Sequence, residues 1–269
     1  SRSHMSKQAM RHPVSAAGLT SSQVTGSRVA LVMRASSDIG VATVQALAQS
    51  GADLALALES EPSPHFMESL RSYGGRVVWF PITGSPNGVE AAQLVRSVVA
   101  ALGGIDVLVA NTIRRVEGQI DDGDVDEDAL DEQMTTDVRS VIALVKATSR
   151  SMRDGGRVVA LGSSLADRVG TPGLADFAAT RAAIAAFCRG AAHDLGPRGI
   201  TVNVVQIGAI ESQTDQGLSR EMLAAERDAN ALGRLGKPSE VADAIMFLAG
   251  PGAAFITGSV LNVDGGYSA

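Results

Sequence analysis

The sequence predicts a single α/β domain, a doubly wound parallel sheet of about seven strands with helices on both faces. The first observation behind this prediction is the alternation of short apolar, β-branched runs with segments that repeat small and apolar residues at helical spacing. The second is the composition: 45% of the residues are hydrophobic but only 3% are aromatic, which suits small-residue helices packed on a buried sheet. A chain of 269 residues is long enough for one such domain.

Taken in order, the apolar runs and the segments with helical spacing alternate along the chain. Strands are expected at 28–33, 54–58, 76–80, 105–110, 157–162, 200–205 and 259–263. Helices are expected at 39–50, 65–73, 89–102, 130–152, 173–195 and 239–248. Right-handed crossovers then give a Rossmann-like sheet, in which ligands bind at the carboxyl ends of the strands. The chemistry is therefore expected in the loops after Met33, Leu58, Ala110, Gly162 and Val205.

Charge and composition exclude several classes of function. The formal net charge is -6 and the basic residues are scattered, which argues against a nucleic-acid partner. The lone Cys188 predicts a core thiol and a reducing compartment. Without a long apolar run or a signal-peptide pattern, no membrane partner and a cytoplasmic location are expected. Residues 1–26 are interpreted as a cloning remnant followed by a flexible arm, and residues 27–269 as the domain.

A second signal is the spacing Ser164, twelve residues, Phe177, three residues, Arg181. Further stretches accompany it: GGIDVLVAN, GPRGITVNVV, GRLGKPSEVADAIMFLA and ITGSVLNVDGGYSA. Together these resemble the short-chain dehydrogenase/reductase family, especially its ketoacyl-carrier-protein reductases, from about Gly26 to the C-terminus. The resemblance implies a nicotinamide-dependent fold with a Ser, Tyr, Lys and Asn catalytic group.

At those four catalytic positions this chain carries Ser164, Phe177, Arg181 and Asp137, so only the serine is retained. In the family the tyrosine hydroxyl passes a proton to the substrate carbonyl oxygen. Phe177 has no proton to give, and losing such an acid costs about 10²- to 10⁴-fold in rate. Tyr73, Tyr267 and the four histidines are not expected to replace it, and no metal site is expected.

The positions that the resemblance assigns to the cofactor are altered as well. The glycine-rich turn of the family becomes Met33 to Gly40, with Arg34 and Asp38 in place of two glycines and only Gly40 retained. A carboxylate within about 4 Å of a phosphate costs on the order of 4 kcal/mol before screening. Because Arg34 and Asp38 are four residues apart and opposite in sign, they are expected to pair and fill the pocket. The alternative is two solvated charges.

The remaining cofactor positions follow the second, third and fourth strands. Leu58 ends the second strand and is followed by Glu59, so a ribose 2′-phosphate would meet an acid and no nearby base. Pro81 stands where the family has its adenine-contacting acid, and Asn111 belongs to a changed NNAG motif. No NAD(P) binding is therefore expected.

Three functions remain open at this point. The first is a catalytically inactive subunit that assembles with an active homologue in a mixed dimer or tetramer. The second is a lyase, cyclase or isomerase that works without nicotinamide on the Ser164 pocket, with Asp137 as base. The third is a weak NAD(P)-dependent oxidoreductase. A small-molecule ligand in the cleft and a homo- or hetero-oligomer are compatible with all three.

Overall fold

The computed structural model describes residues 27–112, 114–212 and 220–269. Within these ranges seven parallel strands form one sheet in the order β3-β2-β1-β4-β5-β6-β7. The strands are β1 Val29–Met33, β2 Asp53–Leu58, β3 Val77–Pro81, β4 Ile105–Ala110, β5 Met152–Ser163, β6 Thr201–Ile207 and β7 Val260–Val263. The predicted fold, a Rossmann-like doubly wound sheet in one α/β domain, is confirmed. The arm predicted at 1–26 lies outside the described residues.

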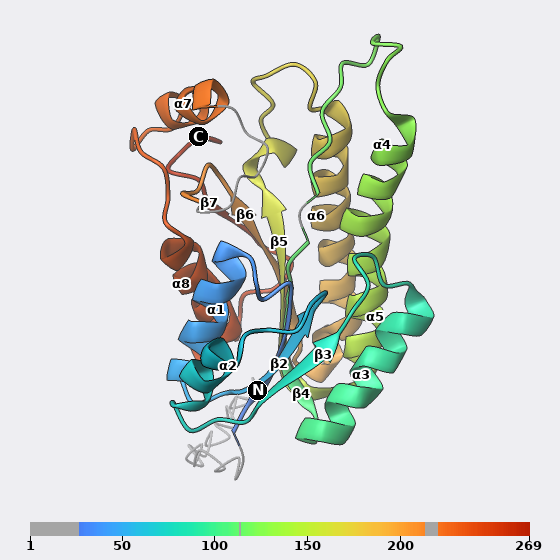
Figure 1. The fold of residues 1–269 in the computed structure, drawn as a ribbon, viewed down its shortest axis with the longest axis vertical. Helices are drawn as coiled ribbons and strands as arrows, with labels where there is room; N and C mark the ends of the chain where they lie inside the picture. The colour runs from blue at the N-terminus through green and yellow to red at the C-terminus, as the bar shows by residue number, and fades with distance from the viewer. Residues whose placement is uncertain (1–26, 113, 213–219) are drawn as a thin grey trace, which may run out of the picture.

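Helices cover both faces of this sheet (Figure 1). On one face lie α1 Asp38–Gln49, α2 Pro64–Arg71 and α8 Pro238–Ala249. On the other lie α3 Gly88–Leu102, α4 Glu127–Met134, α5 Ser140–Ser151 and α6 Ala175–Leu195, while α7 Arg220–Ala229 stands near the C-terminus. Within the described ranges, none of these helices combines the length and the apolar character that crossing a membrane requires.

Two large clusters of buried side chains form the core, one on each face of the sheet. Every residue of β1, β2 and β6 is buried, which is why β1 and most of β2 are continuous apolar runs in the sequence, whereas β6 also buries the polar Asn203 and Gln206. Cys188 lies in the cluster beneath α6, so the prediction of a core thiol is confirmed. Burial raises the pKa of its thiol to about 12, which keeps it protonated and unreactive at neutral pH.

Two helical segments differ from the prediction. The single helix expected at 130–152 is divided by a π-turn at Thr135–Arg139, which separates α4 from α5. A π-turn of this kind frequently occurs at a functional site, and it holds Asp137. The helix α7 was not predicted, and half of its ten residues are charged.

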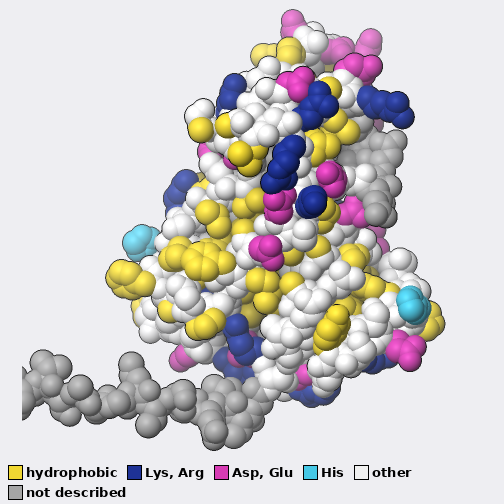
Figure 2. Space-filling model, turned by 90° about the vertical axis from the view of Figure 1, so that its left-hand side faces the viewer, with side chains coloured by type: hydrophobic (Ala, Val, Ile, Leu, Met, Phe, Trp, Pro, Cys, Tyr) yellow, Lys and Arg dark blue, Asp and Glu magenta, His cyan; other side chains and the backbone are white. Residues whose placement is uncertain are grey.

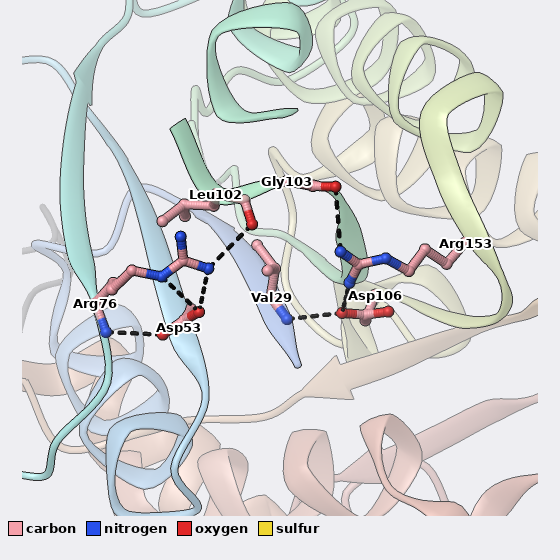
Figure 3. Close-up of polar contacts among 7 residues, drawn as sticks. All are labelled: Val29, Asp53, Arg76, Leu102, Gly103, Asp106 and Arg153. Carbon is pink, nitrogen blue, oxygen red and sulfur yellow. Dashed lines mark hydrogen bonds and ion pairs between the residues drawn. The ribbon is translucent and has the colours of Figure 1, made fainter. Parts of the chain in front are cut away.

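Polar clamps tie the strands together at the end of the sheet opposite the carboxyl ends (Figure 3). The Arg76 guanidinium donates to Asp53 Oδ2 at 2.6 and 2.9 Å and to the Leu102 carbonyl at 3.1 Å. Beside it, Asp106 accepts from Arg153 and from the backbone N–H of Val29, each at 2.7 Å. These contacts fix the start of the strands and cap α3, so that the opposite end of the sheet is held in register.

Replacing Asp53 with asparagine should lower the free energy of unfolding by about 1–2 kcal/mol, since the lost hydrogen bonds are charge-assisted and Arg76 is partly solvated. Burial alone would raise the pKa of Asp53, but the hydrogen bonds from Arg76 and Ser27 outweigh it and hold that pKa below 3.8. The stabilisation is therefore present above that pH and is lost as the pH falls through the lowered pKa.

Urea unfolding of the parent chain and of Asp53→Asn at pH 7 and in acid measures this difference. Arg76→Gln is the matched control, because it removes the same contacts from the other side. A gap between parent and variant that stays constant into strong acid would contradict the assignment.

Candidate functional site

A cleft of about 300 Å³ opens at the carboxyl ends of the central strands. Its wall combines residues from the loops after β1, β4, β5 and β6 with residues from α6, α7 and the C-terminal segment. The position agrees with the general rule for ligand sites in open parallel sheets. The residues that line it include Arg34, Ser37, Asp38, Asn111, Arg115, Ser163, Ser164, Phe177, Arg181, Ile207, Gly208, Glu226, Asn230, Asp264 and Tyr267.

The turn between β1 and α1 is tight and internally hydrogen bonded. Arg34 takes a left-handed φ of 54°, a conformation that costs a side-chain-bearing residue about 1–2 kcal/mol. Its carbonyl accepts from the N–H and the hydroxyl of Ser37. Ser37 caps α1 by accepting from the Gly40 N–H at 3.0 Å, and it also accepts from Asn111 at 2.9 Å. A Cβ at Gly40 would lie 2.4 Å from the Arg34 oxygen, so only glycine fits there.

The expected pairing of Arg34 with Asp38 is wrong. Arg34 Nη2 lies 3.7 Å from Glu59 Oε1, and both side chains are partly exposed. Asp38 begins α1, lines the cleft, and its Oδ2 accepts from the Ser212 hydroxyl at 2.6 Å. The i, i+4 rule applies along a helix, whereas Arg34 sits in a turn before the helix begins and its guanidinium lies near Glu59 instead.

Two further positions that were assigned to the cofactor lie at the ends of β2 and β3. Leu58 and Pro81 are register partners at the ends of β2 and β3. Pro81 lies on the sheet's edge strand, where its missing N–H removes no ladder bond. Beyond the end of β2, the Arg34 guanidinium lies near the Glu59 carboxylate. The expectation of an acid without a nearby base is therefore corrected.

Ser164 and Phe177 come together at the floor of the cleft. Ser164 directly follows β5, is buried, and donates from Oγ to the Ile207 carbonyl over a long 3.4 Å. Phe177 projects from the first turn of α6 and packs with Leu165, Leu174 and Tyr267. The predicted neighbourhood of these two residues is present in the structure.

Asp137 and Arg181 form an ion pair at the same end of the sheet. The side chain of Asp137 is 0% exposed and that of Arg181 is 1% exposed, and Arg181 Nη2 contacts Asp137 Oδ2. The N–H of Arg114 donates to both carboxylate oxygens, and Arg181 Nη1 donates to the Thr112 carbonyl at 3.0 Å. Burial raises the pKa of Asp137, while Arg181 and the Arg114 N–H act in the opposite direction. Unlike Arg181, Asp137 is not part of the cleft wall.

Among the residues that line the cleft, three were not predicted from the sequence to belong to the site: Tyr267, Arg115 and Glu226. Tyr267 was set aside as distant, but β7 pairs with β6 and a turn through Gly265 and Gly266, both at positive φ, brings its ring against Phe177. Arg115 follows β4 and lies over the Phe177 ring at 5.7 Å from its centroid. Glu226 reaches the cleft from α7, the helix that was not predicted. Only the chain-end motif containing Tyr267 offered a signal.

Charges of both signs accompany this site. On the face shown in Figure 2, charged side chains are concentrated over the upper half, and the lower half is more hydrophobic. The cleft wall itself carries Arg34, Arg115 and Arg181 against Asp38, Glu226 and Asp264. Across the described residues, no group of three or more His, Cys, Asp or Glu side chains is arranged to hold a metal ion.

The chain is similar in sequence and in structure to known reductases and dehydrogenases. Residues 34–268 match the family model described as "Enoyl-(Acyl carrier protein) reductase". A 3-oxoacyl-[acyl-carrier-protein] reductase of Vibrio cholerae is 34% identical over 89% of this chain and 96% of its own. A short-chain dehydrogenase from Burkholderia cenocepacia, solved in complex with NADP, is 34% identical with a TM-score of 0.84, covering 91% of this chain and 99% of its own. A blue fluorescent protein from a metagenomic library, solved with NADPH, is 33% identical with a TM-score of 0.84, covering 92% and 100%.

These relatives correct two expectations. An inactive subunit was expected from the changes at Phe177, Arg181 and Asp137, but the similar proteins include reductases and a dehydrogenase. Absence of a nicotinamide cofactor was expected from Arg34 and Asp38, but two similar structures contain NADP or NADPH. Both expectations took a changed side chain as a lost function, whereas much of a dinucleotide site is backbone.

Proposed function

The chain belongs to the short-chain dehydrogenase/reductase family, and from that premise we propose that it is a nicotinamide-dinucleotide-dependent oxidoreductase of modest turnover acting on a carbonyl or hydroxyl substrate. The observation that carries the proposal is that a single cleft joins the tight β1–α1 turn to Ser164. The turn is suited to a diphosphate and the serine to a substrate oxygen. The similarity to a 3-oxoacyl reductase makes a 3-oxoacyl thioester the first substrate to test.

The backbone of the β1–α1 turn fits a dinucleotide. The space at Gly40 admits no side chain, which keeps the turn tight and the amino end of α1 directed at the cleft. Peptide N–H groups and the helix dipole at such an end favour a diphosphate. At the end of β2, Glu59 could accept from a ribose hydroxyl and Arg34 could pair with a 2′-phosphate, so both NAD and NADP are compatible.

The residues around the reacting end are proposed to have distinct roles. A bound reduced nicotinamide would supply a hydride to the substrate carbonyl carbon. Ser164 Oγ, held at 3.4 Å from the Ile207 carbonyl, can turn to donate to the substrate oxygen. Phe177 forms an apolar wall beside it, and Arg181 is a positioning residue that ties α6 to the β4 loop through Thr112. Asp137 is buried away from the cleft, which does not favour its use as a base.

Asp38 is the feature that opposes a diphosphate, and replacing it with glycine should tighten binding of NADPH and NADH by at least about tenfold. A carboxylate within about 4 Å of a phosphate costs on the order of 4 kcal/mol before screening by water and salt. Fluorescence titration of the reduced cofactor measures the dissociation constant of parent and variant.

Asp38→Asn is the matched control, because it removes the charge and keeps a side chain that can still meet Ser212. It should recover most of the gain, and the gain should shrink as salt rises. Absence of saturable binding by the parent, by Asp38→Gly and by Asp38→Asn alike would refute the proposed function.

Assembly as a homo-oligomer is part of the proposal. Phe255 is fully exposed, and Phe247 and Leu261 are partly exposed near the last strand, which favours contact with a second copy. Light scattering of the purified full chain gives the oligomeric mass.

A further inference from the structure

Carbonyl reduction requires a proton at the substrate oxygen, and Phe177 cannot supply one. The described cleft wall carries several side chains that can donate a proton or a hydrogen bond, among them Ser164, Tyr267, Arg115, Arg181 and Glu226. Arg181 is paired with Asp137 and donates to the Thr112 carbonyl, and a guanidinium does not release its proton, while a serine hydroxyl is a poor acid by itself. The choice therefore falls between Tyr267 and the pair formed by Arg115 and Glu226.

Arg115 is held between two carboxylates and the Phe177 ring. Its Nε lies 2.8 Å from Glu117 Oε1, and its Nη1 lies 3.6 Å from Glu226 Oε1. The guanidinium also lies 5.7 Å from the centroid of Phe177, on the cleft wall. Its Nη2 is buried and has no hydrogen-bond partner among the described residues. A buried donor of this kind favours an acceptor brought by a ligand or water.

Glu226 faces the same cleft from α7 and is 19% exposed. Burial raises the pKa of its carboxyl group, Arg115 opposes that shift, and Glu117 adds to it. A carboxyl group with a raised pKa can hold a proton closer to neutral pH than an exposed glutamate does. Two further acids and three further ionisable groups share the cleft wall with this pair: Asp38, Asp264, Arg34, Arg181 and Tyr267.

We propose that Glu226, positioned by Arg115, is the proton donor of this site and replaces the tyrosine hydroxyl that Phe177 lacks. The inference rests on the proposed function. As the hydride of a reduced nicotinamide dinucleotide forms the new C–H bond, the carbonyl π pair moves to oxygen and takes the proton of the Glu226 carboxyl. A bound dinucleotide would supply the two electrons of the hydride, the carbonyl would become an alcohol, and Arg115 would stabilise the Glu226 carboxylate that remains. Arg115 Nη2 donates to the oxygen while its negative charge develops.

Tyr267 is less suited to this role. Its ring packs into a hydrophobic cluster with Leu165, Leu174 and Phe177. The Arg168 guanidinium covers the ring at 4.8 Å from the centroid and donates to the Tyr267 carbonyl. A Cβ built at Gly170 would lie 3.2 Å from the hydroxyl, which places that hydroxyl beside the loop before α6.

The test compares Glu226→Gln with Glu226→Asp, Tyr267→Phe and Asp228→Asn in the full chain, using NADPH and a 3-oxoacyl thioester. Asp228 is the matched control, because it is a carboxylate on the same helix that is exposed and paired with Arg227. The dissociation constant of NADPH is measured first, and it should stay within about twofold of the parent in every variant. Absence of NADPH binding by the parent would refute the proposed function itself, independently of Glu226.

We expect Glu226→Gln to lower kcat for reduction by about 10²-fold or more. In the parent, kcat should fall as the pH rises through the pKa of Glu226, and this limb should be absent in Glu226→Gln and partly retained in Glu226→Asp. Carbon-13 NMR of the glutamate carboxyl groups provides a readout independent of turnover, in which the resonance missing from Glu226→Gln should titrate above the ordinary glutamate range. Unchanged kcat and pH profile in Glu226→Gln, loss of the limb in Tyr267→Phe, or an ordinary titration of that resonance would each overturn the assignment.

Discussion

Replacing Arg181 with methionine should lower the free energy of unfolding by about 3–5 kcal/mol. The substitution leaves the Asp137 carboxylate without its charged partner at a position with no solvent exposure. The backbone N–H of Arg114 still donates to it, but this one donor cannot balance a full charge at that depth. Urea unfolding at neutral pH, followed by circular dichroism, measures the loss.

The double variant Asp137→Asn/Arg181→Met is the control for this prediction. It removes both charges at once, so no uncompensated charge stays buried, and most of the stability should return. A single Arg181→Met variant as stable as the parent would contradict the view that the buried pair holds α6 against the π-turn.

Replacing Phe177 with tyrosine should raise kcat for carbonyl reduction by about tenfold, less than the 10²-fold or more that a positioned acid adds to a site without one, because Glu226 already supplies the proton in the parent. Phe177 lines the cleft beside Ser164, so an added hydroxyl can point into open space. The Arg181 guanidinium lies 5.0 Å from the centroid of the ring and is occupied by Asp137, which keeps the expected gain modest. Steady-state consumption of NADPH with a 3-oxoacyl thioester measures it.

Combining Phe177→Tyr with Glu226→Gln sharpens this prediction. A tyrosine hydroxyl should make the Glu226 carboxyl dispensable, so the combined variant should exceed Glu226→Gln alone by more than Phe177→Tyr exceeds the parent. Strictly multiplicative effects would mean that the two groups do not serve the same proton.

The fold was predictable because its signals are local. The strands β1 and β2 are buried on both faces, and β1 and most of β2 are therefore unbroken apolar runs in the sequence. The division of the helix at Thr135–Arg139 was not predictable from periodicity, since the apolar spacing continues across the π-turn. Nor was α7, half of whose ten residues are charged.

The site could be predicted only where the proximity of its residues follows from their spacing along one helix or from their position at the end of a strand. Phe177 and Arg181 lie one turn apart on α6, and Ser164 follows β5, so their proximity follows from the fold. The predicted ion pair between Arg34 and Asp38 was wrong, because Arg34 lies in the turn before the helix begins and its guanidinium is near Glu59. Tyr267 and Glu226 are distant in sequence, and only the pairing of β6 with β7 and the placement of α7 reveal that they share a cleft with Phe177.

The most direct test of the proposed oxidoreductase activity is transfer of a label from cofactor to substrate. The parent chain and Phe177→Tyr are incubated with a 3-oxoacyl thioester and with NADPH or NADH deuterated at the transferable position. We expect deuterium in the product alcohol from both proteins, more slowly from the parent. Deuterium in the product from Phe177→Tyr but none from the parent, with cofactor bound to both, would contradict this expectation.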